Sequence, residues 1–150
     1  HGGIKRNQHD MIGYNSRLDE IQAAILDVKL KQINKLIKKR IGVAETYYRL
    51  IKNDKIRLPY KDSNGKHTFN QFTIRVENRN KLENHLKKYK IPYGIYHPKP
   101  IYKYKAYANY KFSDLPMVKK VSNQCLSLPI YPELELKDIK IISNVLNEYE

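Results

Sequence analysis

The stretch Ile12–Leu26, IGYNSRLDEIQAAIL, decides the fold, because a helical pattern begins there beside an asparagine and an arginine. Asn15 and Ser16 suit the N-cap of this helix, and Asp19 follows them in the manner of a variant capping box. The N–H groups at a helix start also attract phosphate, to which Asn15 and Arg17 would add a neutral donor and a cation. The residues alone therefore leave two interpretations open, a cap or a helix end that faces an anionic ligand.

The helical pattern continues with hardly an interruption from Ser16 to Ile51. Two apolar registers follow each other along it, so we expect different faces to be buried at its two ends. A helix of this extent would be about 50 Å long, which exceeds the width of a small domain. We therefore expect it to bridge two bodies, one of them outside this sequence, with a bend at Gly42. Without that second body an apolar stripe would be exposed, formed by Leu18, Ile21, Ile25 and Val28.

The patterns that follow predict a small sheet covered by helices. Residues 67–76 alternate as a strand does, with Phe72, Ile74 and Val76 on the covered face. A short amphipathic helix over 78–90 and a second strand over 91–98 would complete a unit of βαβ or split type. The later elements are expected to be a tyrosine-rich loop over 99–112, a helix over 114–124, an extended segment over 126–134 and an amphipathic helix over 136–149.

Composition limits the class of protein. The 150 residues, 41% hydrophobic and 29% charged, suit one modest core, and no apolar run is long enough to span a bilayer. The N-terminus has neither a signal peptide nor an initiator methionine, so we expect a soluble piece of a longer protein. The single cysteine, Cys125, has no internal disulfide partner and no charged sequence neighbour. It indicates a packed thiol in a reducing, cytoplasmic setting.

The charge balance raises the question of a polyanionic partner. The net charge is +14, from 29 basic and 15 acidic residues, and such a surplus suits nucleic acid. However, 22 of the 29 basic residues are lysines spread along the chain. Surfaces that recognise bases favour arginine, whose planar fork pairs with guanine. A basic nucleic-acid-binding domain therefore remains an alternative, and we expect no nucleic-acid partner.

Several motifs, in order along the chain, give it a family resemblance. The segment 13–26, GYNSRLDEIQAAIL, is similar to the signature of the DegT/DnrJ family of nucleotide-sugar aminotransferases, which are pyridoxal-phosphate enzymes of the aspartate aminotransferase fold. The resemblance implies that the chain is the C-terminal portion of such an enzyme. Residues 1–51 would be the end of the large domain with a long interdomain and dimer helix, and 52–150 the small α/β domain. The other matching segments are His1-Gly2, 70–86, 94–102 and 115–134.

The resemblance implies roles for four residues. Asn15 would reach across a dimer interface to the cofactor phosphate of the neighbouring subunit, and Arg17 would lie near the sugar nucleotide. His97 and Tyr102 belong to the segment that resembles the substrate loop, in which Tyr102 stands where the family commonly has a histidine. A tyrosine can donate a hydrogen bond but does not titrate near neutral pH. The residues alone explain His97, Tyr102 and Tyr104 as well by rings that pack against the sheet.

The family's Schiff-base lysine, the acid that holds the pyridine nitrogen and the aromatic that stacks on the ring all lie upstream of the signature. We therefore expect no catalytic residue and no metal site in this chain, which should be inactive alone. The implied full enzyme transfers an amino group, by resemblance from glutamate, to a nucleotide-linked keto sugar for polysaccharide or glycan biosynthesis. It would be a cytoplasmic homodimer with shared active sites. A non-catalytic dimerisation or interaction module is the other alternative.

Overall fold

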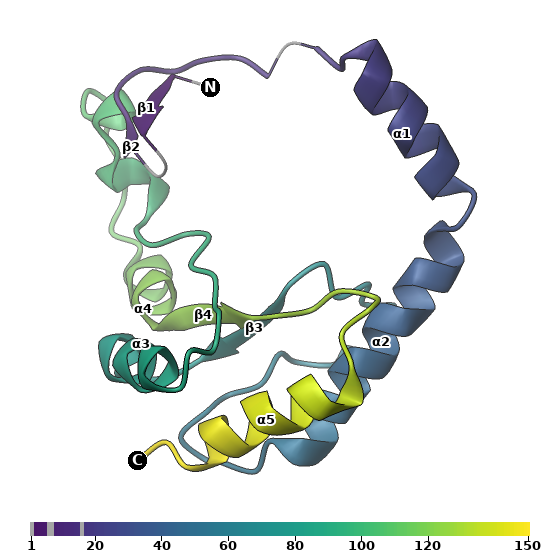
Figure 1. Cartoon of the computed structure of the whole chain (residues 1–150). Helices are drawn as coiled ribbons and strands as arrows, with labels where there is room; N and C mark the ends of the chain where they lie inside the picture. The colour runs from purple at the N-terminus through teal and green to yellow at the C-terminus, as the bar shows by residue number, and fades with distance from the viewer. Residues whose placement is uncertain (1, 6–7, 16) are drawn as a thin grey trace.

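The chain folds into an open ring in which two helices form one side and a loop-rich segment forms the other. The computed structural model describes residues 2–5, 8–15 and 17–150, without the side chain of Ile4. In Figure 1 the helices α1 (Glu20–Leu30) and α2 (Ile33–Leu50) descend on one side, and the small sheet lies at the base. An extended segment connects α1 to an N-terminal hairpin of β1 (Gly3–Lys5) and β2 (Gln8–His9), which the sequence did not predict.

The single long helix predicted for residues 16–51 is wrong, because α1 and α2 are separate. Lys31 and Gln32 form a turn between them, in which the Gln32 N–H donates to the Lys29 carbonyl at 3.0 Å. The break falls where the two apolar registers meet, so each helix carries its own stripe. Gly42, where a bend was expected, lies inside the continuous helix α2, and a Cβ there would meet nothing within 4 Å.

The predicted N-cap at Asn15 is wrong as well. Helix α1 begins at Glu20, and its N-cap is Asp19, whose side chain makes no capping hydrogen bond. Ser16, the other predicted capping residue, lies outside the described residues. Asn15 therefore stands several residues before the helix, in an extended segment, and starting the helix does not explain it.

Helix α1 has no buried residue. The stripe predicted to be exposed is exposed, with Ile21 at 77% and Val28 at 61% of full accessibility. Helix α2 differs, since its second half buries Val43, Ala44 and Tyr47 in the core. One side of the ring thus carries an uncovered apolar helix, and contiguous apolar surface of this kind marks a site of association.

The sheet consists of β3 (Phe72–Arg75) and β4 (Cys125–Leu128), which pair antiparallel with Phe72 opposite Leu128. The strand predicted within 67–76 is confirmed, and its apolar side chains are buried as expected. The βαβ or split unit is wrong, because the partner of β3 comes from much later in the chain. The strand predicted over 91–98 is also absent from the structure, where only Gly94 bridges to Ser127. Prolines at both ends of that segment lack the N–H groups that a strand needs.

The three later helices agree with prediction within a few residues. Helices α3 (Arg79–Lys88) and α5 (Leu136–Asn147) bury apolar residues at helical spacing, whereas α4 (Pro116–Gln124) buries the polar Ser122 and Gln124. Asn78 caps α3, since its side chain accepts a hydrogen bond from the Lys81 N–H at 3.0 Å. The prediction of a small sheet covered by helices is therefore confirmed. No helix in the described part of the chain has the length and apolarity to span a bilayer.

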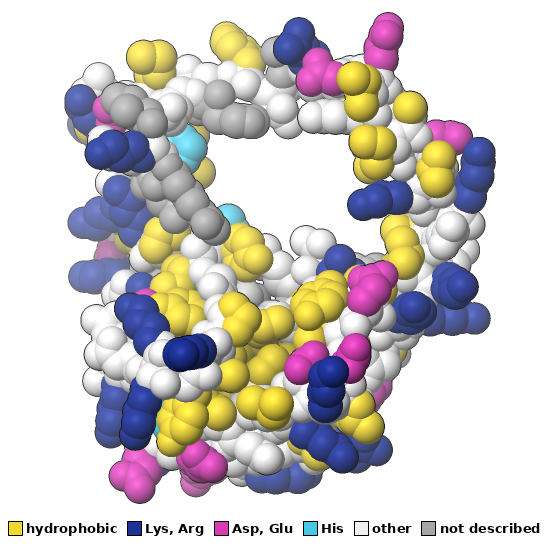
Figure 2. Space-filling view, viewed as in Figure 1, with side chains coloured by type: hydrophobic (Ala, Val, Ile, Leu, Met, Phe, Trp, Pro, Cys, Tyr) yellow, Lys and Arg dark blue, Asp and Glu magenta, His cyan; other side chains and the backbone are white. Residues whose placement is uncertain are grey.

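The core lies between α2, α5 and the sheet. Figure 2 shows hydrophobic side chains gathered at the surface over this part of the molecule. Tyr47 is fully buried and donates its hydroxyl to the Pro129 carbonyl at 2.9 Å. Burial raises its pKa, so the hydroxyl stays protonated and keeps this bond. Arg40 donates to the carbonyls of Phe69, Asn70 and Ile130 at 3.2 to 3.4 Å. These bonds tie α2 to the segments that enter β3 and leave β4.

Candidate functional site

A cavity of about 810 Å³ opens between the sheet, α4 and the N-terminal hairpin. Its wall combines segments that are distant in sequence: β3 and β4, the loop after Gly94, two 3₁₀ turns (Ile101–Lys103 and Lys105–Tyr107), and residues 9–13. Gly2 makes the hairpin possible, because it has a φ of +77° and a Cβ there would lie 2.0 Å from the Met11 carbonyl oxygen. The volume is within the range of small-molecule sites, roughly 300 to 1,000 Å³.

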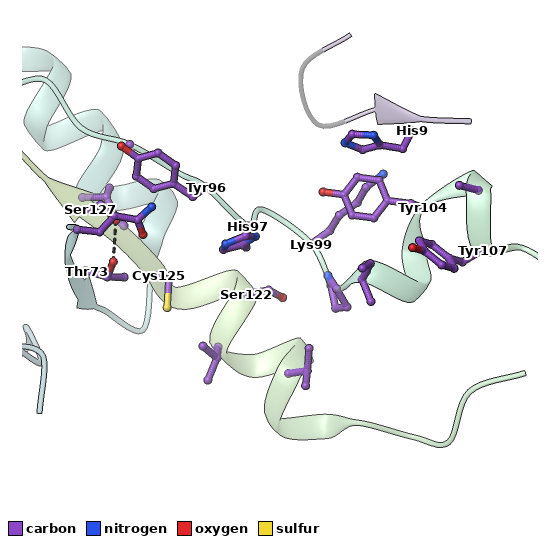
Figure 3. A pocket seen from close by; sticks show the side chains of 18 of the residues that line it. His9, Thr73, Tyr96, His97, Lys99, Tyr104, Tyr107, Ser122, Cys125 and Ser127 are labelled. Atoms are coloured by element: carbon purple, nitrogen blue, oxygen red, sulfur yellow. Dashed lines mark hydrogen bonds between the residues drawn. The ribbon is translucent and has the colours of Figure 1, made fainter. Parts of the chain in front are cut away.

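The polar groups of the cavity come from the open face of the sheet and from the loop. Thr73 of β3 and Ser127 of β4 share a hydrogen bond of 2.8 Å between their hydroxyl oxygens, which Figure 3 shows at one end of the site. Figure 3 also shows His97 between this pair and Tyr104. Hydroxyl, amide and imidazole groups in a partly apolar wall suit a ligand rich in hydroxyl groups.

The opposite wall is apolar and includes Met117, Val118 and Val121 of α4. Cys125, at the start of β4, is half-buried beside them. Burial raises the pKa of its thiol, and the positive charges of Arg75 and Arg79 lower it by less. This agrees with the packed thiol that the sequence indicated.

We expect Cys125 to be alkylated slowly by iodoacetamide at neutral pH. Because burial raises the pKa, the folded chain holds less thiolate than an unfolded one, and the rate should fall at least a few-fold. The rate should rise as the pH approaches the raised pKa. The measurement is the alkylation rate of the native chain against the same chain in urea. A native thiol that reacts as fast as the unfolded one would contradict this assignment.

A second, shallower groove of about 680 Å³ lies beside the cavity. Three residues line both spaces, namely His9, Lys99 and Tyr104. The His9 and Tyr104 rings meet edge to face with centroids 5.3 Å apart, and the Lys99 Nζ lies 4.3 Å from the Tyr104 centroid. The hairpin and the tyrosine-rich loop are therefore in contact at the boundary between the cavity and the groove.

The structure separates the four predicted site residues into two groups. His97 lines the cavity, and Tyr102 lines the adjacent groove. Asn15 and Arg17 line neither space and are exposed on the segment before α1. Arg17 pairs with Asp19, Nε to Oδ1 at 3.2 Å. A cation near a helix start is disfavoured by the helix dipole, and here the carboxylate of Asp19 in the same chain offsets that effect.

The aromatic partners of Tyr102 and Tyr104 lie outside the sheet, against which the alternative explanation packed their rings. The Tyr102 ring lies 5.7 Å from that of Phe112, within the loop, and Tyr104 meets His9 of the hairpin. Thr73 and Ser127 were not predicted as site residues, although the alternation around Phe72 and Ile74 places Thr73 on the opposite, polar face of its strand. The polar face of the strand was the signal that could have identified Thr73. The sequence did not show that this strand pairs with the strand that carries Ser127.

Comparison with known proteins gives consistent matches along the chain. The sequence profile of the DegT/DnrJ/EryC1/StrS aminotransferase family matches residues 1–147. The chain is 37% identical to the UDP-2-acetamido-2-deoxy-3-oxo-D-glucuronate aminotransferase of Pseudomonas aeruginosa, over 97% of this chain and 40% of that protein. It is 35% identical to a pleiotropic regulatory protein of Geobacillus stearothermophilus, over 99% of this chain and 41% of that one. The chain thus spans about two fifths of the length of the curated relatives it matches.

Solved structures agree. The crystal structure of S. venezuelae DesV in complex with a ketimine intermediate superposes with a TM-score of 0.83 at 31% identity, over 99% of this chain and 41% of that one. The crystal structure of a DegT DnrJ EryC1 StrS aminotransferase from Brucella abortus superposes with a TM-score of 0.79 at 34% identity, over 97% of this chain and 40% of that one. These matches confirm the resemblance found in the sequence and the predicted fold class.

The family's enzymes use pyridoxal phosphate, and the described residues do not by themselves form a site for it. A Schiff-base lysine must be desolvated or activated by a neighbour. Lys99, a lysine in the cavity wall, is exposed. Asn15 is also exposed, and one amide does not make a phosphate cradle. We therefore assign no chemical step to the cofactor here.

Proposed function

Because the chain belongs to the DegT/DnrJ/EryC1/StrS aminotransferase family, we propose that it is the C-terminal part of a nucleotide-sugar aminotransferase. Residues 1–51 would be the last part of the large domain together with the interdomain helix, and residues 52–150 would form the small domain. The whole enzyme would use pyridoxal phosphate to move an amino group from glutamate to a nucleotide-linked keto sugar. Such amino sugars would serve polysaccharide or glycan biosynthesis in the cytoplasm.

The observation that carries this proposal is the cavity together with its family context. A wall with hydroxyls on one side and apolar α4 residues on the other suits a sugar ring, which has polar edges and apolar faces. His97 lies in that wall and Tyr102 in the adjoining groove, and both belong to the segment that resembles the substrate loop. The chain would supply part of the sugar site, and the catalytic lysine would come from the remaining length of the protein.

The partner in this proposal is a second copy of the whole enzyme. The exposed apolar stripe of α1 supports it, since such a surface requires cover by another body. Asn15 and Arg17 lie on the segment that leads into this helix and do not line the cavity of their own chain. Residues placed there are suited to serve the site of a neighbouring subunit.

The test uses a longer chain in which the segment that precedes this region in the relatives is joined to residues 1–150. We expect its pyridoxamine-phosphate form to convert to the pyridoxal form on addition of a nucleotide-linked keto sugar, and glutamate to reverse the change. The absorbance of the cofactor reports both half-reactions. Residues 1–150 alone should give no turnover. A cofactor-loaded longer chain that aminates no nucleotide-linked keto sugar would overturn the proposal.

A further inference from the structure

We propose that the ion pair between Arg79 and Glu83 of α3 sets the spacing between two walls of the cavity, and that both are positioning residues for the substrate. This inference rests on the proposed function, because it concerns how well the cavity fits the sugar of a nucleotide-linked substrate. Neither of the two side chains lines the cavity. Arg79 acts through Ser122 and Glu83 through Tyr93, and the sequence singled out neither charged residue.

Arg79 holds the end of the helix that forms the apolar wall. Its Nη1 donates a hydrogen bond to the carbonyl of Ser122, which is 7% exposed and lines the cavity. Helix α4 passes directly into β4 at Cys125, with no loop between them. The last carbonyls of a helix lack partners within it, and the helix dipole favours a cation beside them. Arg79 therefore fixes the point at which the helical wall meets the sheet.

Glu83 holds the loop that forms another wall. Its Oε2 accepts a hydrogen bond from the Tyr93 hydroxyl at 3.0 Å, and the next residue, Gly94, lines the cavity. Burial, followed by the hydrogen bond to Glu83, raises the pKa of Tyr93, so the hydroxyl stays protonated and remains a donor. Glu83 thus anchors the loop at the position where it begins to line the cavity.

One ion pair joins the two anchors. The Arg79 Nε lies 3.4 Å from the Glu83 Oε1, one helical turn along α3. These side chains are 13% and 18% exposed, whereas those of the Lys61–Glu45 pair are 47% and 54% exposed. An exposed pair contributes little, but removal of one partner from a shielded pair leaves a charge without compensation. The contacts from Ser122 through the ion pair to Tyr93 are therefore continuous and hold both segments to α3.

The two anchored segments lie on different sides of the site. Figure 3 shows Ser122 and Cys125 on one side and Tyr96, from the loop after Gly94, on the other. In Figure 1, α3 lies at the same end of the sheet as α4, so one helix can hold both segments. A misplacement of about 1 Å in groups that position a substrate is costly. Because the pair supports walls that bind the substrate, we expect its loss to raise KM more than it lowers kcat.

Tyr93→Phe tests the connection without removing a charge. The change deletes only the hydroxyl that Glu83 accepts, and the thiol of Cys125, at the end of α4, reports whether that helix end moves. We expect iodoacetamide to alkylate Cys125 of the folded 150-residue chain about threefold faster, because a loosened helix end reduces the burial that raises the thiol pKa. The amide chemical shifts of residues 122–125 should change as well.

Tyr48→Phe is the matched control. The Tyr48 hydroxyl donates to the Pro59 carbonyl at 2.8 Å, and Tyr48 does not line the cavity. This variant loses a comparable hydrogen bond, but the alkylation rate of Cys125 should stay as in the wild type. Urea unfolding verifies that both variants are folded. An unchanged rate in Tyr93→Phe, or an equal rise in the control, would overturn the proposal.

A paired replacement separates positioning from stability in the longer chain. Arg79→Met with Glu83→Leu removes both charges, and apolar replacement of a shielded pair is often neutral for stability. We expect this variant to raise the KM for a nucleotide-linked keto sugar about tenfold with little change in kcat. Tyr93→Phe should raise the same KM about threefold, so the test does not depend on folding of the double variant.

Lys61→Met with Glu45→Leu is the control for the paired replacement, because it also removes one ion pair without changing the net charge. This exposed pair contacts neither wall, and both kinetic constants should stay as in the wild type. If Arg79→Met with Glu83→Leu has the wild-type unfolding midpoint and the wild-type KM, the proposal fails.

The two chains distinguish failure of this inference from failure of the proposed function. The Cys125 rate requires no substrate, so the 150-residue chain tests the connection between the walls independently. If Cys125 responds to Tyr93→Phe but the longer chain aminates no nucleotide-linked keto sugar, the proposed function fails and the connection stands. If amination proceeds and neither Tyr93→Phe nor the double variant changes KM, only this inference fails.

Discussion

Replacement of Phe72 by alanine should strongly destabilise the fold. The Phe72 ring is fully buried and lies 5.0 Å from Tyr47, 5.3 Å from Tyr48 and 6.1 Å from Phe69, centroid to centroid. It joins β3 to α2, so its loss leaves a cavity between the sheet and the helix. Removal of a buried phenylalanine ring costs about 3 to 5 kcal/mol, a large share of a typical unfolding free energy of about 5 to 15 kcal/mol.

Phe112→Ala is the matched control, because it deletes the same ring from an exposed position. Phe112 is 45% exposed and contacts only tyrosine rings of the loop among its described aromatic neighbours. We expect it to cost about 1 kcal/mol or less. Urea unfolding followed by circular dichroism measures both. Equal losses in the two variants would show that the core is not organised around β3 and α2.

Local patterns along the chain were sufficient to predict most elements. Alternation around Ile74 identified β3, and helical spacing identified α3, α4 and α5 within a few residues. The failed strand pairing depends on contacts between distant segments. No local pattern in 67–76 shows that its partner strand begins at Cys125, so tertiary packing rather than propensity decided the pairing. The turn at Lys31 is a different case, because α1 buries no residue and the apolar pattern runs through the turn without a stop signal.

The candidate site could be predicted only in part for a similar reason. His97 was identified through a motif, and it does line the cavity. Thr73 and Ser127 come together through strand pairing, and Lys99 and His9 through contact between the loop and the hairpin. Such groupings are not encoded in the spacing of residues along the chain. Likewise, no pattern in the sequence shows that Gly13 lines the cavity while Asn15 does not.

Mixing two inactive forms of the longer chain should restore activity if Asn15 and Arg17 act across the subunit interface. As single changes, Asn15→Ala should weaken cofactor retention and Arg17→Ala should mainly raise the KM for the sugar nucleotide. Loss of one charged hydrogen bond costs about 1.5 to 3 kcal/mol, which corresponds to roughly tenfold or more. Neither change should lower the melting temperature appreciably, because Asp19 and not Asn15 caps α1, and the exposed Arg17–Asp19 pair contributes little. A clear loss of stability would favour a structural role.

The decisive experiment combines a subunit without the Schiff-base lysine and a subunit carrying Asn15→Ala with Arg17→Ala. In the mixed dimer, the single lysine-bearing site is served across the interface by intact Asn15 and Arg17. Random pairing makes half of the dimers mixed with one working site each, so about a quarter of the wild-type activity should return. As a control, a lysine-bearing subunit with Asn80→Ala and Lys140→Ala, exposed positions on α3 and α5, should be active before mixing. If mixed dimers form and stay inactive, Asn15 and Arg17 serve the site of their own chain, because in that arrangement the lysine-bearing subunit would lack both.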